Sequence, residues 1–266
     1  MKYKLFCIDL DGTLLTDRKE IDGRDIVALR KASDQGVKIA LITGRMPAAT
    51  DMIVRKLAIP CIRACNAGTY ILKDECCIHT EYLSVDTMKE VYESIQRFGV
   101  PLWIFRGRQW YVTSKDSFVY TEEGLINRMA EETSVEALAL KWIREQTGPN
   151  KLLIGAEPSI VQNVCAVLRN RQDADMACSS ENYLEIFPKG MNKGKALRVI
   201  CEKEDIPVRE TVAFGDQELD IPMIEAAGTA VAMGNAIEEL KQKADHITKT
   251  NNEAGIAYAI EHFLNY

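Results

Sequence analysis

The ten residues FCIDLDGTLL, numbered 6–15, decide the fold of this chain. The apolar segment 4–8 predicts a strand, and two carboxylates follow it, Asp9 and Asp11. Because a strand repeats every two residues, these two side chains begin on the same side before the chain turns at Gly12. Two like charges this close repel, so they persist where a cation, a proton or a reaction uses them. Asp-Gly is a common turn pair and would be enough for an ordinary turn after a strand, which does not require the preceding Asp9.

The first third of the chain alternates short apolar segments with amphipathic ones. Strands are expected at 4–9, 38–42 and 59–65. Between them, helices are expected at 22–36, where Asp22 can cap the first turn and Gly36 can end the last, and at 48–57. This order of strands and helices predicts an α/β fold with a doubly wound, mainly parallel sheet.

The pattern changes after about residue 81 and returns near residue 190. The middle segment predicts helices at 85–98 and 159–169, a hairpin at 102–105 and 110–113, and strands at 152–156, 175–179 and 183–187. After it, strands are expected at 211–214, 230–233 and 246–248, with helices at 193–202 and 255–264. We therefore predict a core of residues 1–81 and 190–266, with an inserted α+β domain at 82–189.

Three further motifs follow the opening stretch in order. Residues 43–45 read Thr-Gly-Arg after an apolar strand, Lys193 follows a Gly-rich turn, and residues 215–220 read G-D-x-x-x-D after another strand. In open α/β sheets the ligand lies beyond the carboxyl ends of the strands, where these motifs fall. The ordered set resembles the haloacid dehalogenase superfamily of phosphotransferases. The long insert narrows the resemblance to the Cof-like branch (class IIB), whose members carry an α/β cap there, and it covers essentially the whole chain.

The resemblance implies a Mg²⁺-dependent phosphatase of small phosphorylated metabolites, sugar phosphates or related phosphomonoesters. A carboxylate that attacks phosphorus splits one difficult displacement into two easier ones through an aspartyl-phosphate intermediate. By resemblance, Asp9 is this nucleophile, and Asp11 is general acid to the leaving group and general base to water. The second role requires a carboxyl pKa raised toward neutrality.

The resemblance also assigns the ligands of the metal and of the phosphate. The implied Mg²⁺ ligands are Asp9, Asp216 and the main-chain carbonyl of Asp11, with Asp220 in the outer shell. The transferring phosphoryl group is expected to contact a set of hydrogen-bond donors and cations: Thr43, Gly44, Arg45 and Lys193.

Two positions depart from the family pattern. Leu219 stands where Cof-like members usually carry Asn, and it cannot hydrogen-bond a phosphate or a metal-bound water. The segment 66–68 reads Asn-Ala-Gly in place of the usual Asn-Gly-Ala. If Ala67 takes a positive φ, the exchange costs about 1 kcal/mol.

Composition limits the partners and the location. The net charge of -6 over 266 residues argues against a nucleic-acid partner. No apolar run reaches the ~20 residues that span a bilayer, and the opening residues do not read as a secretory signal, so a cytoplasmic protein without membrane partners is expected. The eight cysteines lack a C-x-x-C motif and are expected as free thiols. The sequence does not fix the oligomeric state; a monomer is preferred.

Two other functions remain open, and the substrate is not named by the sequence. A phosphomutase would interconvert isomers without releasing phosphate, and a sensor, suggested by Leu219, would bind a phosphorylated ligand without turnover. A nucleotide-binding module of the Rossmann type requires G-x-G-x-x-G after the first strand, and residues 9–13 lack it. Several aromatic side chains of the inserted domain either face the substrate or pack its sheet: Trp103, Phe105, Trp110 and Tyr183.

Overall fold

The computed structural model describes residues 2–264, which form two compact units. The first unit contains the chain up to Arg45, Thr50–His79 and the chain from Asn192 onward; the second contains Met46–Ala49 and Thr80–Met191. The ends of the predicted core, residue 1 and residues 265–266, lie outside the described residues. The assignment of catalysis to residues 1–81 and 190–266, and of specificity to 82–189, stays a prediction.

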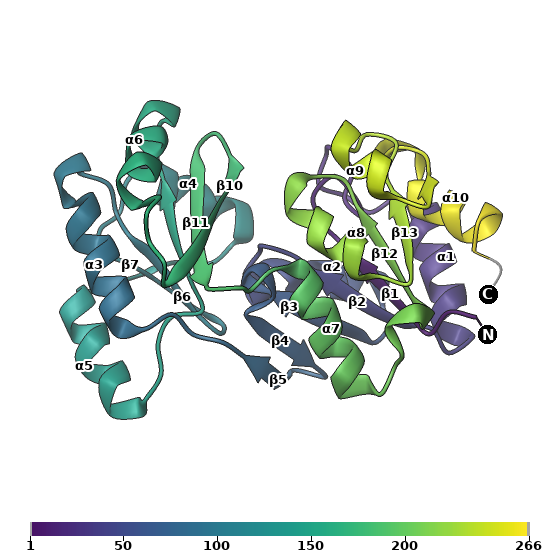
Figure 1. The fold of residues 1–266 in the computed structure, drawn as a ribbon, viewed down its shortest axis with the longest axis horizontal. Coiled ribbons are helices and arrows are strands. Elements are labelled where there is room, and N and C mark those ends of the chain that lie inside the picture. The colour runs from purple at the N-terminus through teal and green to yellow at the C-terminus, as the bar shows by residue number, and fades with distance from the viewer. Residues whose placement is uncertain (1, 265–266) are drawn as a thin grey trace. The chain divides into compact units, whose positions relative to one another are not determined.

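The first unit is built on an eight-stranded sheet in the order β14-β13-β12-β1-β2-β3-β4-β5 (Figure 1). Adjacent strands from β14 to β3 are parallel, and β4 runs antiparallel to β3. The strands are β1 (Leu5–Ile8), β2 (Lys38–Ile42), β3 (Cys61–Cys65), β4 (Tyr70–Lys73), β5 (Cys76–Thr80), β12 (Thr211–Gly215), β13 (Thr229–Ala232) and β14 (His246–Ile247). The first strand therefore pairs with β12, from the last third of the chain, and with β2.

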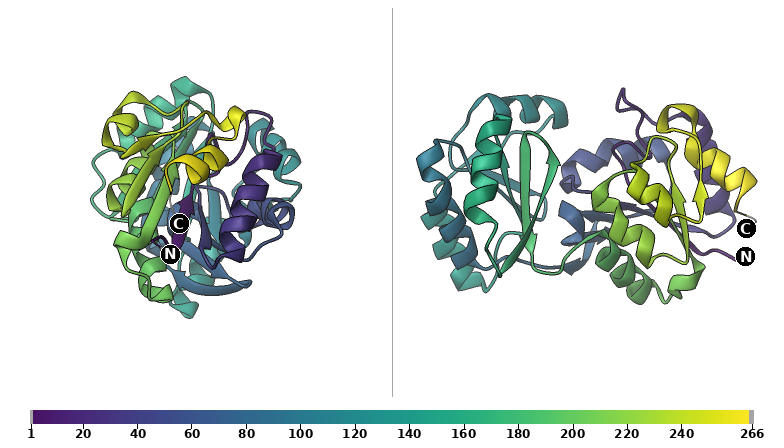
Figure 2. Two further views of the ribbon diagram at one scale, coloured as in Figure 1. Left: turned by 90° about the vertical axis from the view of Figure 1, so that its right-hand side faces the viewer. Right: turned by 45° about the horizontal axis from the view of Figure 1, so that its top comes forward.

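Helices cover both faces of this sheet (Figures 1 and 2). One face packs against α1 (Gly23–Asp34), α2 (Pro47–Leu57) and α10 (Gly255–His262). On the other side, α7 (Lys193–Glu204) and α8 (Ile221–Ala226) pack together and against β2 and β12. A short helix, α9 (Glu238–Lys243), follows β13, and each of the described helices is too short or too polar to span a bilayer. The predicted doubly wound, mainly parallel sheet is confirmed.

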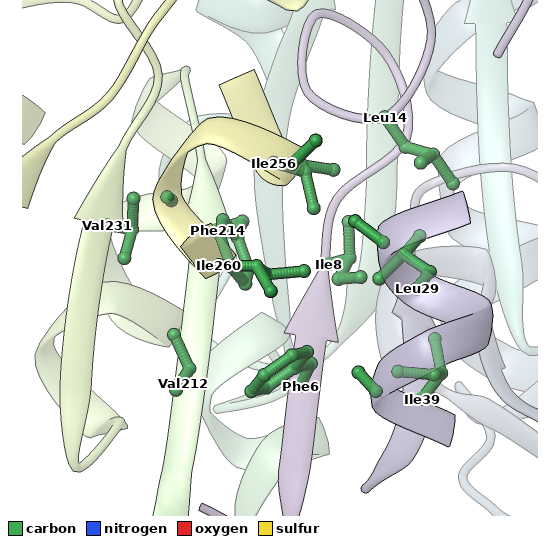
Figure 3. Packing of buried hydrophobic residues seen from close by; sticks show 14 of the residues in the cluster. Phe6, Ile8, Leu14, Leu29, Ile39, Val212, Phe214, Val231, Ile256 and Ile260 are labelled. Atoms are coloured by element: carbon green, nitrogen blue, oxygen red, sulfur yellow. The ribbon is translucent and has the colours of Figure 1, made fainter. Parts of the chain in front are cut away.

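The central strand is held by a continuous apolar core on one face of the sheet (Figure 3). Phe6 and Ile8 of β1 are fully buried beside Phe214 of β12, Leu29 of α1 and Ile260 of α10. The rings of Phe6 and Phe214 meet edge to face, with centroids 5.9 Å apart. Each buried side chain of this size contributes roughly 1.5–3 kcal/mol. The residues that follow β1 therefore begin from a rigid position.

The helix that follows β1 begins at the predicted cap. Asp22 is extended, and its Oδ1 accepts the backbone N–H of Arg24 at 2.8 Å, which satisfies one of the free donors of the first turn. Ala28, Leu29 and Ala32 form the buried face of α1 at helical spacing. The chain then turns through Gly36, whose φ of 90° suits glycine, and enters β2.

The second unit is an α+β domain with a six-stranded sheet in the order β10-β11-β9-β6-β7-β8. Its strands are β6 (Trp103–Arg106), β7 (Gln109–Val112), β8 (Glu131–Glu132), β9 (Lys151–Gly155), β10 (Ala174–Ser180) and β11 (Tyr183–Pro188). The helices α3 (Val85–Ile95), α5 (Val135–Glu145) and α6 (Pro158–Leu168) share a core with Ile104, Leu152 and Ile186 of the sheet. The helix α4 (Ser117–Ile126) packs with the aromatic side chains that alternate to the other face.

Candidate active site

The loop after β1 is held by hydrogen bonds within itself and to two neighbouring segments. The N–H of Asp9 donates to the carbonyl of Phe214 at 3.1 Å, and the N–H of Leu14 returns to the carbonyl of Asp9 at 3.2 Å. Gly12 has φ 87°, and the side-chain amide of Asn235 donates to its carbonyl at 2.8 Å. The pairing with β12 and this turn together fix the backbone from which the carboxylates of Asp9 and Asp11 project.

Three buried carboxylates and one ammonium meet beyond the carboxyl ends of the central strands. Oxygens of Asp9, Asp216 and Asp220 all lie within 4.8 Å of one another. Lys193 is the first residue of α7, and its Nζ lies 2.5 Å from Asp9 Oδ1 and 2.5 Å from Asp220 Oδ1. Asn192 caps this helix by accepting the N–H of the third helical residue, so the ammonium is held at the helix start. The structure thus brings four of the predicted site residues together.

The electrostatics of this cluster favour a divalent cation. Burial, together with repulsion from Asp220 and against the attraction of Lys193, raises the pKa of Asp9 to about 8. Burial also raises the pKa of Asp216 to about 6, although Thr13 donates to it. Burial opposes the charge of Lys193, but Asp220 and Asp9 outweigh it and raise the pKa of the ammonium. One ammonium therefore faces three carboxylates, and this excess of buried negative charge on oxygen donors fits Mg²⁺.

Asp216 and Asp220 are held in different ways. Asp220 Oδ2 accepts the backbone N–H groups of Asp216 at 2.9 Å and Gln217 at 3.0 Å, while its other oxygen accepts from Lys193. Asp216 receives the Thr13 hydroxyl at 2.8 Å and the Gln217 amide at 3.1 Å. Asp220 thus accepts two backbone N–H groups and the ammonium, whereas both oxygens of Asp216 accept neutral side-chain donors. The place of Asp220 in the outer shell stays a prediction.

Two of these partners were not predicted from the sequence. Thr13 is fully buried, and the signal for it was the hydroxyl within an otherwise apolar segment after Gly12. Nothing in the sequence pattern around Gln217 predicted a role in the site. Its amide supplies a hydrogen bond to Asp216 in a segment where Leu219, half-buried in a 3₁₀ turn, has no polar atom to offer.

Asp11 lies in a separate ion pair. Arg45 Nε donates to Asp11 Oδ2 at 2.7 Å and Arg45 Nη2 donates to Oδ1 at 2.6 Å, while Lys19 Nζ approaches Oδ1 at 2.8 Å. Burial opposes ionisation, but Arg45 and Lys19 outweigh it and hold the pKa of Asp11 at about 2. The expectation of a raised pKa at Asp11 is therefore wrong for this arrangement, and Lys19 was not predicted at all.

The predicted phosphate-binding loop follows β2. The Thr43 hydroxyl accepts the N–H of Arg45 at 3.1 Å, and Gly44 is half-buried between them. The turn after β3 supports this loop, because the N–H of Asn66 donates to the carbonyl of Arg45 at 2.9 Å and that of Ala67 to Thr43 at 3.0 Å. Strand order places the loop beside Asp9, since β1 and β2 are parallel neighbours. The loop contacts the first motif through the pair between Arg45 and Asp11.

The four aromatic residues that the sequence singled out in the second unit pack against one another. Trp103 lies 5.2 Å from Trp110 and 6.0 Å from Tyr183 between ring centroids, and Phe105 stacks on Trp110 at 5.9 Å. Trp103, Phe105 and Trp110 are buried, while Tyr183 is half-buried. They contribute to the packing of this sheet, and a role toward substrate stays a prediction.

The comparisons with known sequences agree with this geometry. The sequence model of a family described as haloacid dehalogenase-like hydrolase matches residues 6–260. A putative phosphatase from Streptococcus pyogenes is 27% identical over 99% of both chains. A 5-amino-6-(5-phospho-D-ribitylamino)uracil phosphatase from Bacillus subtilis is 29% identical over 98% of this chain and 96% of its own length.

The comparisons with solved structures agree as well. A protein from Thermotoga maritima is 30% identical, with a TM-score of 0.85 over 99% of this chain and 98% of its own. A haloacid dehalogenase-like hydrolase from Bacteroides thetaiotaomicron is 28% identical, with a TM-score of 0.86 over 98% of this chain and all of its own.

Proposed function

The chain belongs to the haloacid dehalogenase-like hydrolases, within the Cof-like group, and we propose on that premise that it hydrolyses small phosphomonoesters with Mg²⁺ through an aspartyl-phosphate. It is a phosphatase. The observation that carries the proposal is the buried cluster in which Asp9 meets Lys193 beside Asp216 and Asp220. Sugar phosphates and related esters are the proposed substrates, and one relative is named for a phosphate on a ribityl chain.

We propose that an oxygen of Asp9 attacks phosphorus. The loop after β1 holds this carboxylate, so little reorganisation is needed at the moment of attack. Lys193 is within reach of the same centre and would stabilise the oxygens of the phosphoryl group. Asp9, Asp216 and the main-chain carbonyl of Asp11 would hold Mg²⁺, with Asp220 outside. Bound Mg²⁺ would offset the negative charges of the phosphate and of the attacking carboxylate.

Asp11 would carry the proton in both half-reactions. To do so it must leave the two-point pair with Arg45 and the contact with Lys19. A substrate phosphate is the natural competitor for that pair, because guanidinium binds phosphate and carboxylate with the same planar geometry. Arg45 would thus turn from Asp11 to the substrate, so that substrate binding removes the stronger of the two cation contacts of Asp11. Thr43 and Gly44 would donate to the phosphoryl oxygens from the same loop.

The test is a phosphate-release screen over a broad panel of phosphomonoesters, with Mg²⁺ and with a chelator. Wild-type protein should release phosphate only with the metal, and Asp9→Asn should lose at least ~10³-fold in turnover. Asp34→Asn, the same change at an exposed residue near the end of α1, is the matched control and should behave as wild type. Turnover by Asp9→Asn equal to that of the control would reject covalent catalysis at this position.

The same screen separates the other candidate functions. Interconversion of isomers without phosphate release would indicate a phosphomutase, and saturable binding without turnover across the panel would indicate a sensor. The cytoplasmic location, the monomeric state and the absence of nucleic-acid and membrane partners stay predictions.

A further inference from the structure

Two cysteines of the second unit face each other across an element boundary. Cys165 lies on α6 and Cys178 lies on β10, and their sulfur atoms are 3.8 Å apart. Both are present as thiols. The strand β10 is at one end of the six-stranded sheet order, so the pair sits where a helix meets an edge strand.

The packing of α6 explains why one thiol is only half-buried. Val161, Val164 and Leu168 are the buried stripe of this helix, at spacings of three and four residues. Cys165 follows Val164 and lies beside the stripe, half-buried against the same core. Cys165 therefore packs against this core while its sulfur lies 3.8 Å from that of Cys178.

The alternation of β10 explains the exposure of the other thiol. Side chains of Ala174, Met176 and Cys178 point to one face, and their exposure rises from buried to half-buried to exposed along the strand. The pairing with β11 shifts register just after Cys178, which bends the strand end. Cys178 is thus accessible to small solutes while it remains next to Cys165.

We propose that Cys165 and Cys178 are a redox-modification site that a hydroperoxide converts to a disulfide. The Cys178 sulfur attacks the peroxide, the O–O bond breaks, and a sulfenic acid forms while water (or an alcohol) leaves. The Cys165 sulfur then attacks the sulfenic sulfur, the S–S bond forms, and the sulfenic oxygen leaves as water with the thiol proton. Two thiols are oxidised by two electrons, and one hydroperoxide is reduced.

The different surroundings of the two thiols indicate which one reacts with the peroxide first. Cys178 is exposed, so it meets the oxidant first. Burial, reinforced by the hydrogen bond and charge of Cys178, raises the pKa of Cys165 to about 11, so this thiol is a poor first nucleophile. Its place beside Cys178 makes it the resolving partner, and closing the bond requires the sulfurs to approach from 3.8 Å to about 2 Å.

The described residues support oxidation of this cysteine pair rather than the binding of a metal ion. Within residues 2–264, the group of three or more His, Cys, Asp or Glu side chains spaced for a metal ion is the acid cluster of Asp9, Asp216 and Asp220. The thiol pair has no third ligand of that kind in the described chain, whereas thiolate sites for zinc require four ligands in structural centres. Oxidation needs only the two sulfurs.

The test uses the full chain, reduced and then treated with one equivalent of hydrogen peroxide at neutral pH. Free thiols are blocked, and peptides are mapped by mass spectrometry with dimedone as the probe for sulfenic acid. We expect an intramolecular peptide link between Cys165 and Cys178 that a thiol reductant removes. Cys165→Ser should leave Cys178 labelled by dimedone several-fold more than in the wild type, and Cys178→Ser should leave Cys165 reduced.

The matched control is Cys76→Ser, which removes another exposed thiol, on β5, and should leave the link unchanged. Peptide mapping of the wild type needs no substitution, so it stands if a variant fails to fold. The proposal is overturned if the link does not form in the wild type, or if dimedone labels Cys178 equally in the wild type and in Cys165→Ser. It is also overturned if the link forms only between separate chains.

Discussion

Gly12 lies directly against the carboxylate of Asp216. A β-carbon at position 12 would stand 2.3 Å from Asp216 Oδ2 and 2.8 Å from its Cγ, closer than any real contact of that kind. The φ of Gly12 is 87°, which adds a second reason for glycine. The loop after β1 and the acid after β12 therefore fit together only when residue 12 has no side chain.

The first prediction follows from this contact. Gly12→Ala should displace the Asp216 carboxylate by an ångström or more and lower kcat/KM by roughly 10²-fold or more. Gly99→Ala is the matched control, because Gly99 also has a positive φ, 66°, but an added β-carbon there would meet no atom within 4 Å. Both variants should pay a similar backbone cost of about 1–2 kcal/mol. Steady-state kinetics beside urea unfolding would separate the two effects, and equal activity of the two variants would contradict the prediction.

A second prediction concerns the hydroxyl that donates to Asp216. Thr13→Val keeps the shape of a fully buried side chain but removes the 2.8 Å hydrogen bond. Because groups that orient a metal ligand typically contribute 10–100-fold to affinity or activity, the Mg²⁺ concentration for half-maximal activity should rise by about that factor. Thr13→Ser retains the hydroxyl and should stay near the wild type. An unchanged Mg²⁺ titration for Thr13→Val would show that this bond does not support the metal site.

A third prediction concerns a buried acid outside the site. Asp25 on α1 is fully buried; its Oδ1 accepts the N–H of Ala257 at 2.8 Å, and no described residue donates to its Oδ2. Burial raises the pKa of Asp25 to about 6, although the Ala257 bond opposes the shift. Between about pH 4 and pH 6 the unfolded chain loses this proton and the folded chain keeps it, so the free energy of unfolding falls as pH rises.

Asp25→Asn tests that sign. The variant has no proton to lose at this position, so the stability of the wild type relative to Asp25→Asn should fall by roughly 2–3 kcal/mol from pH 4 to pH 7. Urea unfolding of both proteins across this range gives the difference directly, and the comparison does not depend on the absolute stability of the variant. Parallel pH profiles would refute the assignment.

A fourth prediction concerns the turn that supports the Thr43 loop. Ala67 has φ 59°, as its exchange with glycine in the motif suggested, and this conformation is costly for a residue with a β-carbon. Ala67→Gly should therefore raise the free energy of unfolding by about 0.5–1 kcal/mol, after the entropy lost by glycine is counted. Ala137→Gly, at an exposed position of α5, should lower it by about 1 kcal/mol. Destabilisation by both changes would mean that the strain at Ala67 is small.

The central strands of the fold could be predicted from the sequence, whereas some peripheral strands and helices were missed. The central strands and the Asp22 cap are local features, since an apolar run and a capping carboxylate are each visible within a few residues. β5 was not predicted, because its side chains are exposed or half-buried throughout and show no alternation. α5 was missed although its signal was present: Ser134 as a cap, followed by buried Val135, Leu138 and Trp142 at helical spacing.

In the site too, some features could be predicted from the sequence, while others depend on contacts between residues far apart in the chain. The carboxyl ends of neighbouring strands converge, so the meeting of Asp9 with Lys193 and Asp216 could be predicted from the order of the motifs. The state of Asp11 could not, because its partner Arg45 is 34 residues away and local periodicity does not say which way that side chain turns. The pKa of a carboxyl depends on such partners. The pKa of Asp11 is therefore lowered, whereas the sequence led us to expect that it would be raised.

The pairing of β1 with β12 has a consequence for synthesis. β1 leaves the ribosome before the other strands of its sheet, yet one of its two neighbours is made only when residues 211–215 emerge. Until then β1 keeps an open edge, which other nascent chains can pair with. The strands of the second unit pair only among themselves within the described chain, so that domain is free to fold while translation continues. Translation that stops after the second unit would therefore leave that unit complete, while the sheet of the first unit stays unfinished and prone to aggregate.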